Sequence, residues 1–250
     1  KAARYSPVLY IKEESKDKLA KELEDKTGVK FNLLLGRQTN ISSFMRHLLV
    51  ARFESSVAAF KASLGYMIQS SEHMLRWIDQ RRKIPVFKKG NLPDVSAFYD
   101  TSDDGMEEIE ELFEKYEARG FFEIDMKYVK DSFVTDVKAD VQLLKNLQEQ
   151  WFGKDNMIKS DPKLDSFIRI VRKQMKNDPN RKLVVFSEFA DTVNYLGKAL
   201  VNAGLPAMKY TSADATSANK DLIRANFDAG LKPALQQNDF CILVATDAIS

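Results

Sequence analysis

Small polar side chains follow two apolar segments of the chain, and these residue types suit contact with phosphate. The segment Lys182–Phe186 continues into Ser187, and the segment Phe240–Ala245 continues into Thr246 and Asp247. In a parallel sheet, residues at the carboxyl ends of the strands line the functional edge. Backbone N–H groups and hydroxyls presented there can bind phosphate oxygens. The pattern therefore predicts a phosphate-contacting edge, and a flavodoxin-like or Rossmann-like sheet fits it equally well.

A basic run in the first half of the chain is a second candidate for phosphate contact. Between Arg76 and Lys89 there are six basic residues against Asp79 alone, and Arg81, Arg82 and Lys83 are consecutive. The segment Asp100–Glu117 holds nine acidic residues against Lys115 alone. The simpler interpretation, which we favour, is two solvated surfaces that partly neutralise each other. The sharper hypothesis is that Arg81, Arg82 and Lys83 form a phosphate-contacting patch, held near the acidic segment until a polyanion displaces it.

Complete catalytic machinery is not apparent in the sequence. There is no Gly-x-Ser-x-Gly motif, and both histidines, His47 and His73, lie within a long helical pattern. No Gly-rich Lys-Ser/Thr phosphate loop occurs, and there is no Asp-Glu pair to coordinate magnesium. One cysteine and two histidines cannot supply a four-ligand zinc site. We therefore expect no catalytic residue and no metal site in this chain, and the sequence argues against a self-contained nucleotide hydrolase.

Composition places the chain among ordinary globular proteins. Its 250 residues are 44% hydrophobic and 30% charged, and the formal net charge is +2, which argues against a wholly basic nucleic-acid wrapper. The single cysteine excludes a disulfide framework. No apolar run approaches the roughly 18 residues of a membrane span, and no signal core follows the N-terminus. We expect a soluble, cytoplasmic protein without membrane contact.

The elements that would position these residues differ between the two parts of the chain. Residues 161–250 alternate helical patterns with short apolar runs, which predicts an α/β fold with a parallel sheet. In this sheet Lys182–Phe186 and Phe240–Ala245 are expected to be adjacent or near-adjacent central strands. Pro206–Tyr210 is a third, shorter strand. Residues 1–160 read as mainly helical. Their apolar spacing predicts two long amphipathic helices, one through Phe44–Ile78 with a kink near Gly65 and one through Phe133–Trp151, and an irregular loop over 84–105.

Three segments of the second part resemble motifs of superfamily-two helicases, most closely the Swi/Snf-type ATP-dependent DNA translocases. Lys182–Leu196 (KLVVFSEFADTVNYL) resembles motif IV, and Ile242–Ser250 (ILVATDAIS) resembles motif V. Between them, Tyr210–Asp214, Lys220 and Ile223–Phe227 stand where the family has its second-lobe nucleic-acid segment. The family has a glycine after the Ser/Thr there, and an arginine where Lys220 stands; this chain has neither. Phe44–Leu64 looks like the helical region that joins the lobes in bacterial members.

The resemblance implies a truncated second RecA-like lobe (residues 161–250) and an inserted helical region (residues 1–160) of a larger ATP-dependent translocase. Phosphate contacts would fall to Ser187, Thr211 and Thr246, and Asp247 would couple the grip on nucleic acid to the nucleotide cleft. For Ser187 and Asp247, helix N-capping is the competing role. The parent protein would use ATP and Mg²⁺, and its partners would be duplex DNA, with RNA left open, and the missing first RecA-like lobe. The alternative is a non-catalytic helical interaction module joined to a generic α/β domain.

Overall fold

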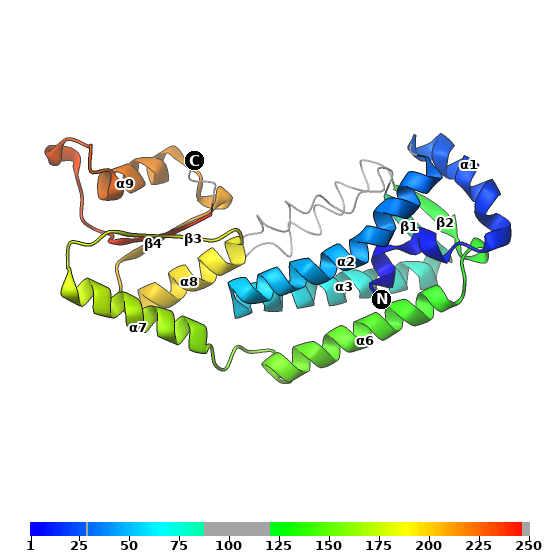
Figure 1. Ribbon diagram of the computed structural model, residues 1–250, viewed down its shortest axis with the longest axis horizontal. Helices are drawn as coiled ribbons and strands as arrows, with labels where there is room; N and C mark the ends of the chain where they lie inside the picture. The colour runs from blue at the N-terminus through cyan, green and yellow to red at the C-terminus, as the bar shows by residue number, and fades with distance from the viewer. Residues whose placement is uncertain (29, 88–120, 247–250) are drawn as a thin grey trace. The chain divides into compact units, whose positions relative to one another are not determined.

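The computed structural model describes residues 1–28, 30–87 and 121–246, and the chain divides into two compact units (Figure 1). Among the described residues, the first unit contains 1–28, 30–54, 60–87 and 121–157. The second unit contains 55–59 and 158–246. The α/β fold with a helical N-terminal region is confirmed. No described helix combines the length and the apolar character that a membrane span requires.

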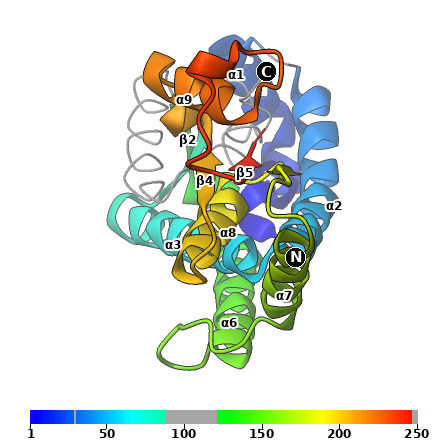
Figure 2. The same ribbon diagram turned by 90° about the vertical axis from the view of Figure 1, so that its left-hand side faces the viewer.

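Helices dominate the first unit. Its helices and strands are α1 (Lys16–Thr27), α2 (Phe31–Ser55), α3 (Val57–Arg81), β1 (Lys83–Phe87), β2 (Phe121–Asp125) and α6 (Ser132–Phe152). The helix predicted through Phe133–Trp151 is confirmed as α6. Figure 2 views α2, α3 and α6 of this unit from one end. Aromatic rings join the three helices, because Phe53 of α2, Phe60 of α3 and Trp151 of α6 lie within 5.7 Å of one another by ring centroids.

The prediction of one long helix through Phe44–Ile78 with a kink near Gly65 is wrong. Ser56 separates α2 from α3, and α3 runs through Gly65 without interruption. The Ser56 hydroxyl accepts a hydrogen bond from the backbone N–H of Ala59 at 3.1 Å, the bond of a helix N-cap. Hydrophobic spacing did not reveal the break because one non-helical residue barely changes the phase of the apolar stripe. Over residues 30–87 and 121–160 the structure therefore has three long helices, α2, α3 and α6, where the sequence pattern predicts two.

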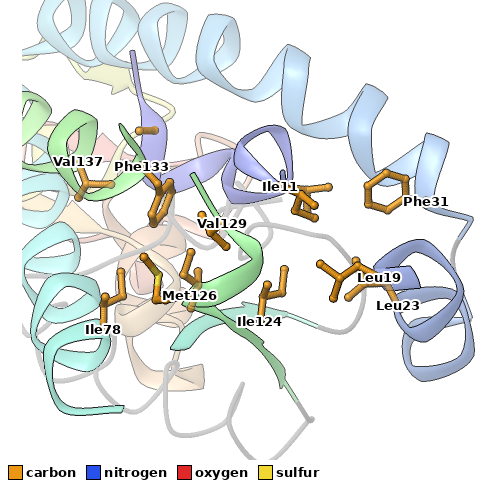
Figure 3. Packing of buried hydrophobic residues seen from close by; sticks show 13 residues of the cluster. Ile11, Leu19, Leu23, Phe31, Ile78, Ile124, Met126, Val129, Phe133 and Val137 are labelled. Atoms are coloured by element: carbon orange, nitrogen blue, oxygen red, sulfur yellow. The ribbon is translucent and has the colours of Figure 1, made fainter. Parts of the chain in front are cut away.

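A buried apolar cluster joins these elements (Figure 3). Figure 3 shows Ile78 of α3 and Phe133 and Val137 of α6 around Ile124, Met126 and Val129, with Leu19 and Leu23 of α1 beyond them. Phe133 is fully buried, and its ring packs edge-on against Tyr10 with centroids 5.1 Å apart. The strand pair and the helices of the first unit thus share one core.

The irregular loop predicted over 84–105 is wrong for its first residues. Strand β1 pairs antiparallel with β2, and Ile84 faces Ile124 in the register. Both isoleucines are buried. Pro85 suggested a break, but each strand of a two-stranded sheet has one unpaired edge, where a residue without an N–H is tolerated. The remainder of the predicted loop, 88–105, and the acidic segment 100–117 lie outside the described residues.

The second unit contains the predicted parallel sheet. Its elements are α7 (Pro162–Asn177), β3 (Leu183–Phe186), α8 (Ala190–Asn202), β4 (Ala207–Tyr210), α9 (Ser217–Phe227) and β5 (Ile242–Ala245). The strand order is β3-β5-β4, and both pairings are parallel. The three predicted strands and the two helices between them are confirmed. Gly204 follows α8 with a positive φ of 75°, a backbone conformation that glycine adopts readily at the end of a helix.

Helices α7 and α8 lie on one face of this sheet and α9 on the other (Figure 1). All four residues of β5 are buried. The prediction that β3 is also central is wrong, because β5 is its only neighbour among the described strands. Helix α9 packs over β4 and β5, so Val184 and Phe186 of β3 stay 41% and 63% exposed. An apolar run alone did not distinguish this edge strand from a central one.

Candidate functional site

The structure brings three of the predicted contact residues together at one edge of the sheet. Ser187, Thr211 and Thr246 follow the last residues of β3, β4 and β5, and those last residues are register partners. The Ser187 N–H donates to the Ala245 carbonyl at 3.1 Å, and the Thr246 N–H donates to the Tyr210 carbonyl at 3.0 Å. Because neighbouring strands lie about 4.8 Å apart, the three residues form a short row at the carboxyl edge. We call this row the hydroxyl edge.

Thr211 is tied to Asp214 within this row. Its hydroxyl donates to Asp214 Oδ2 at 2.8 Å, and its backbone N–H donates to the same oxygen at 3.0 Å. Thr211 is only 1% exposed. Because a hydroxyl has a single proton, the Thr211 side chain cannot donate to a phosphate while it donates to this carboxylate. In this arrangement Thr211 fixes the loop after β4, and the half-buried Ser187 is the stronger candidate for contact.

The Ser187 hydroxyl belongs to a small network of hydroxyl groups inside the second unit. It accepts a hydrogen bond from the Phe189 N–H at 3.2 Å and lies 3.2 Å from the Ser55 hydroxyl. Ser55 in turn lies 2.8 Å from the Thr192 hydroxyl, which is 2.7 Å from that of Ser56. Ser187 makes none of the bonds of a side-chain cap to the first turn of α8. The network instead fixes the direction of its half-buried hydroxyl.

Thr246 is the last residue at this end of the chain that the structure describes. Thr246 is 1% exposed and lies at the end of the central strand. Asp247 lies outside the described residues, so its predicted coupling role stays a prediction. The Tyr210 hydroxyl, one residue before Thr211, is buried without a hydrogen-bond partner. An unsatisfied buried hydroxyl costs free energy, so the packing around it must offset that cost.

The basic patch belongs to the first unit and forms a separate candidate site. Glu123 of β2 accepts a hydrogen bond from the Trp77 indole N–H at 3.1 Å. Its carboxylate also pairs with Lys83 Nζ at 3.0 Å and with Arg81 Nε at 3.4 Å. The Arg81 guanidinium lies over the Trp77 ring, 4.6 Å from its centroid. Arg81 and Lys83, two of the three residues predicted to contact phosphate, therefore already pair with the mostly buried carboxylate of Glu123.

Arg82, the third residue of the basic patch, is exposed and has a backbone φ of 54°. Its carbonyl accepts a hydrogen bond from the Met126 N–H at 3.0 Å, and its N–H donates to the Ile78 carbonyl at 2.8 Å. The backbone of Arg82 thus forms the turn from α3 into β1, and its side chain is presented to solvent.

Neither a metal centre nor an activated nucleophile emerges from the described part of the chain. Within the residues that the structure describes, no three His, Cys, Asp or Glu side chains gather in a way that could hold a metal ion. Burial raises the pKa of the Cys241 thiol, which keeps it protonated at neutral pH. His47 and His73 lie in α2 and α3. The two candidate sites among the described residues consist of hydrogen-bond donors and cations.

Sequence reasoning missed the two carboxylates that govern these sites. Asp214 stands three residues after Thr211, the spacing of a capping box, and that spacing could have revealed the contact. Glu123 gives no comparable signal, because it is 40 residues from Lys83 and meets it only through strand pairing.

Comparison with known proteins gives only distant likenesses, all to solved structures. The chain matches no family model and no curated protein. Among solved structures it is similar to the crystal structure of the Hef helicase domain of Pyrococcus furiosus, with 17% sequence identity and a TM-score of 0.31. The match covers 97% of this chain and 42% of that one, so this chain spans less than half the length of the solved domain. A likeness of this size carries no information about activity.

Proposed function

We propose that this chain is part of an ATP-dependent helicase or translocase that acts on duplex DNA. In this proposal residues 161–250 form most of a second RecA-like lobe, and residues 1–160 form an inserted helical region. The observation that carries the proposal is the register of the sheet, which aligns Ser187, Thr211 and Thr246 at one carboxyl edge. The three helicase-like sequence segments supply these same residues in the family's order.

The hydroxyl edge would hold the sugar–phosphate backbone of the nucleic acid. Hydroxyl and backbone N–H donors position a duplex without reading its sequence, which suits a protein that moves along DNA. ATP and Mg²⁺ would be held chiefly by the first RecA-like lobe of the parent protein, and they would supply the free energy for movement. Asp247 would couple the hydroxyl edge to that nucleotide.

The hydroxyl edge can be tested by removing two hydroxyls with little change in shape. We expect the double variant Ser187→Ala/Thr246→Val to bind a 30-base-pair duplex more weakly, by roughly tenfold for each lost hydrogen bond, or about 1.5 kcal/mol each. The slope of log affinity against log salt should stay unchanged, because neutral hydroxyls release no counterions. Fluorescence anisotropy over a salt series measures both quantities.

A matched control is the double variant Ser160→Ala/Thr135→Val, which removes the same two groups at exposed positions away from the sheet. It should bind the duplex like the unaltered chain. Equal affinities of the two double variants would remove the hydroxyl edge from the proposed function.

The basic patch gives a second test, because Glu123 competes with phosphate for Arg81 and Lys83. If the patch contacts DNA, Glu123→Gln should strengthen duplex binding and steepen the salt slope by about 0.9, the value of one added phosphate contact. The same substitution at Glu149, an exposed residue of α6, changes the net charge equally and serves as control. Identical slopes for both variants would assign the patch to ordinary surface charge.

An exposed apolar surface of the first unit supports the second candidate, a helical protein-interaction module. Phe53, Trp151 and Leu143 are 41%, 48% and 65% exposed, and the first two are in ring contact. Large apolar patches on a protein surface are typical of binding sites for other proteins. The coding sequence upstream of Lys1 separates the two candidates: a phosphate loop followed by an Asp-Glu pair favours the translocase, and an open reading frame that starts near Lys1 favours the module.

A further inference from the structure

Helix α7 of the second unit carries basic side chains along the side that faces away from the sheet. Four basic residues of α7 are exposed: Arg169, Arg172, Lys173 and Lys176. Each lies three or four positions from another of the set, so the four share one side of the helix. The opposite side packs into the core of the unit through Val171, with Phe167, Ile168 and Met175 beside it. We call the four basic residues the α7 stripe.

The charge of the α7 stripe is not neutralised in the described part of the chain. No described carboxylate pairs with Arg169, Lys173 or Lys176, and the contact made by Arg169 is with the Ser166 hydroxyl at 3.5 Å. Arg172 donates to the carbonyl of Ala203 at 2.6 Å, which holds its guanidinium against the end of α8 and leaves its charge without an acidic partner. The one acidic residue of α7, Asp165, lies in its first turn. Other basic residues of the chain do pair, as Lys145 does with Glu72.

The end of the α7 stripe that bears Lys173 and Lys176 lies away from the hydroxyl edge along the strands of the same unit. Helix α7 ends at Asn177 and the chain then enters β3 at Leu183, so the end of α7 that bears Lys173 and Lys176 lies toward the amino ends of the strands. The hydroxyl edge lies at the carboxyl ends. A ligand on the α7 stripe therefore uses a surface that the helicase-like segments do not include.

The geometry of the stripe points to a regular array of phosphates. From Arg169 to Lys176 the helix rises about 10.5 Å. One strand of duplex DNA places a phosphate every 3.4 Å along its axis, so this length faces about three phosphates. A membrane surface fits less well, because an interfacial helix must insert its apolar side, and the apolar side of α7 is buried against the sheet.

We infer that the α7 stripe is a second, sequence-independent binding surface for the phosphate backbone of duplex nucleic acid. The identity of the polyanion rests on the proposed function, and the surface itself rests on the charges of α7. The α7 stripe and the hydroxyl edge would contact the nucleic-acid backbone at two places on one unit. Each contact would then supply only part of the binding free energy.

The experiment removes three charges and measures the salt slope of the whole chain. The triple variant Arg169→Gln/Lys173→Gln/Lys176→Gln keeps good helix formers, and its melting curve checks that it folds. With a 30-base-pair duplex, we expect the salt slope to fall by about 2.7, or 0.9 for each lost phosphate contact. Between 50 and 200 mM salt, the unaltered chain should then lose roughly 40-fold more affinity than the triple variant loses.

A matched control neutralises three exposed lysines elsewhere, as Lys130→Gln/Lys138→Gln/Lys154→Gln. The control changes the net charge equally, and its salt slope should stay within about 0.5 of that of the unaltered chain. Equal slopes for the two triple variants, or no duplex binding by the unaltered chain at 50 mM salt, would overturn the inference. So would binding to phosphatidylserine vesicles that matches duplex binding and is lost in the α7 variant.

The outcomes also separate this inference from the proposed function. A change of slope in the α7 variant, with no loss of affinity in Ser187→Ala/Thr246→Val, keeps the α7 stripe and removes the hydroxyl edge. The reverse result keeps the hydroxyl edge and removes the α7 stripe.

Discussion

Replacing Val244 by aspartate is expected to unfold the second unit. Val244 is fully buried in the central strand β5, with Val185 and Lys209 as its register partners on either side. A carboxylate at this position would lie in the apolar layer between the sheet and α7 and α8, where burial strongly disfavours its charged form. We expect a loss of at least about 4 kcal/mol, a large part of the 5–15 kcal/mol that stabilises a typical domain.

Hydrogen exchange measured by mass spectrometry can follow each segment separately. In the Val244→Asp variant, amides of β3, β4 and β5 should lose protection, and those of α6 in the first unit serve as an internal reference. The matched control is Val184→Asp on the adjacent strand, where the valine is 41% exposed. That substitution should cost less than about 1 kcal/mol because its carboxylate reaches water. Native protection of β5 in Val244→Asp would contradict the assignment of β5 as the buried centre of the sheet.

The chain by itself is expected not to hydrolyse ATP, with or without duplex DNA. Phosphoryl transfer needs backbone N–H groups and a lysine around the phosphates, a magnesium ion held by carboxylates, and a cation at the developing charge. The sequence contains no Gly-rich Lys-Ser/Thr loop and no Asp-Glu pair. Loss of a single preorganised donor commonly lowers a rate by about 10²–10³, and here the whole set is missing.

The measurement is a DNA-stimulated ATPase assay on the purified chain, with a protein that includes the phosphate-loop lobe as the positive reference. Turnover should remain at background in the chain and in its Asp247→Ala variant alike. Activity that co-purifies with the chain and disappears in Asp247→Ala would contradict the proposal and would require a nucleotide site among its own residues.

Elements with a local signature could be predicted from the sequence. The apolar stripe through Phe133–Trp151 depends on a few neighbouring residues, and the helix that it predicts is confirmed as α6. The position of Ser187 and Thr246 at one edge of the sheet could also be predicted, because the carboxyl ends of parallel strands meet there.

Features that depend on contacts between distant residues could not be predicted in the same way. The pairing of β1 with β2 joins segments separated by more than 30 residues, and it alone brings Glu123 to Lys83. The edge position of β3 depends on which strands pair with it, and the amino-acid composition of β3 does not indicate those partners. The break at Ser56 brings the Phe53 ring of α2 against the Phe60 ring of α3, a tertiary contact that continuous helical spacing does not reveal.

The strand order of the second unit has a consequence for the timing of its folding. Strands β3 and β4 have no hydrogen bonds to each other, and both pair with β5, which comes last in the chain. Both Leu183 and Ala207 have Ile242 as their register partner. It is synthesised 59 residues after Leu183 (242 − 183) and 35 residues after Ala207 (242 − 207). A ribosome that adds 5–20 residues each second needs about 3–12 s to cover the longer interval. During that interval the nascent β3 and β4 segments have no sheet to join, so they are the parts of this unit most in need of a chaperone.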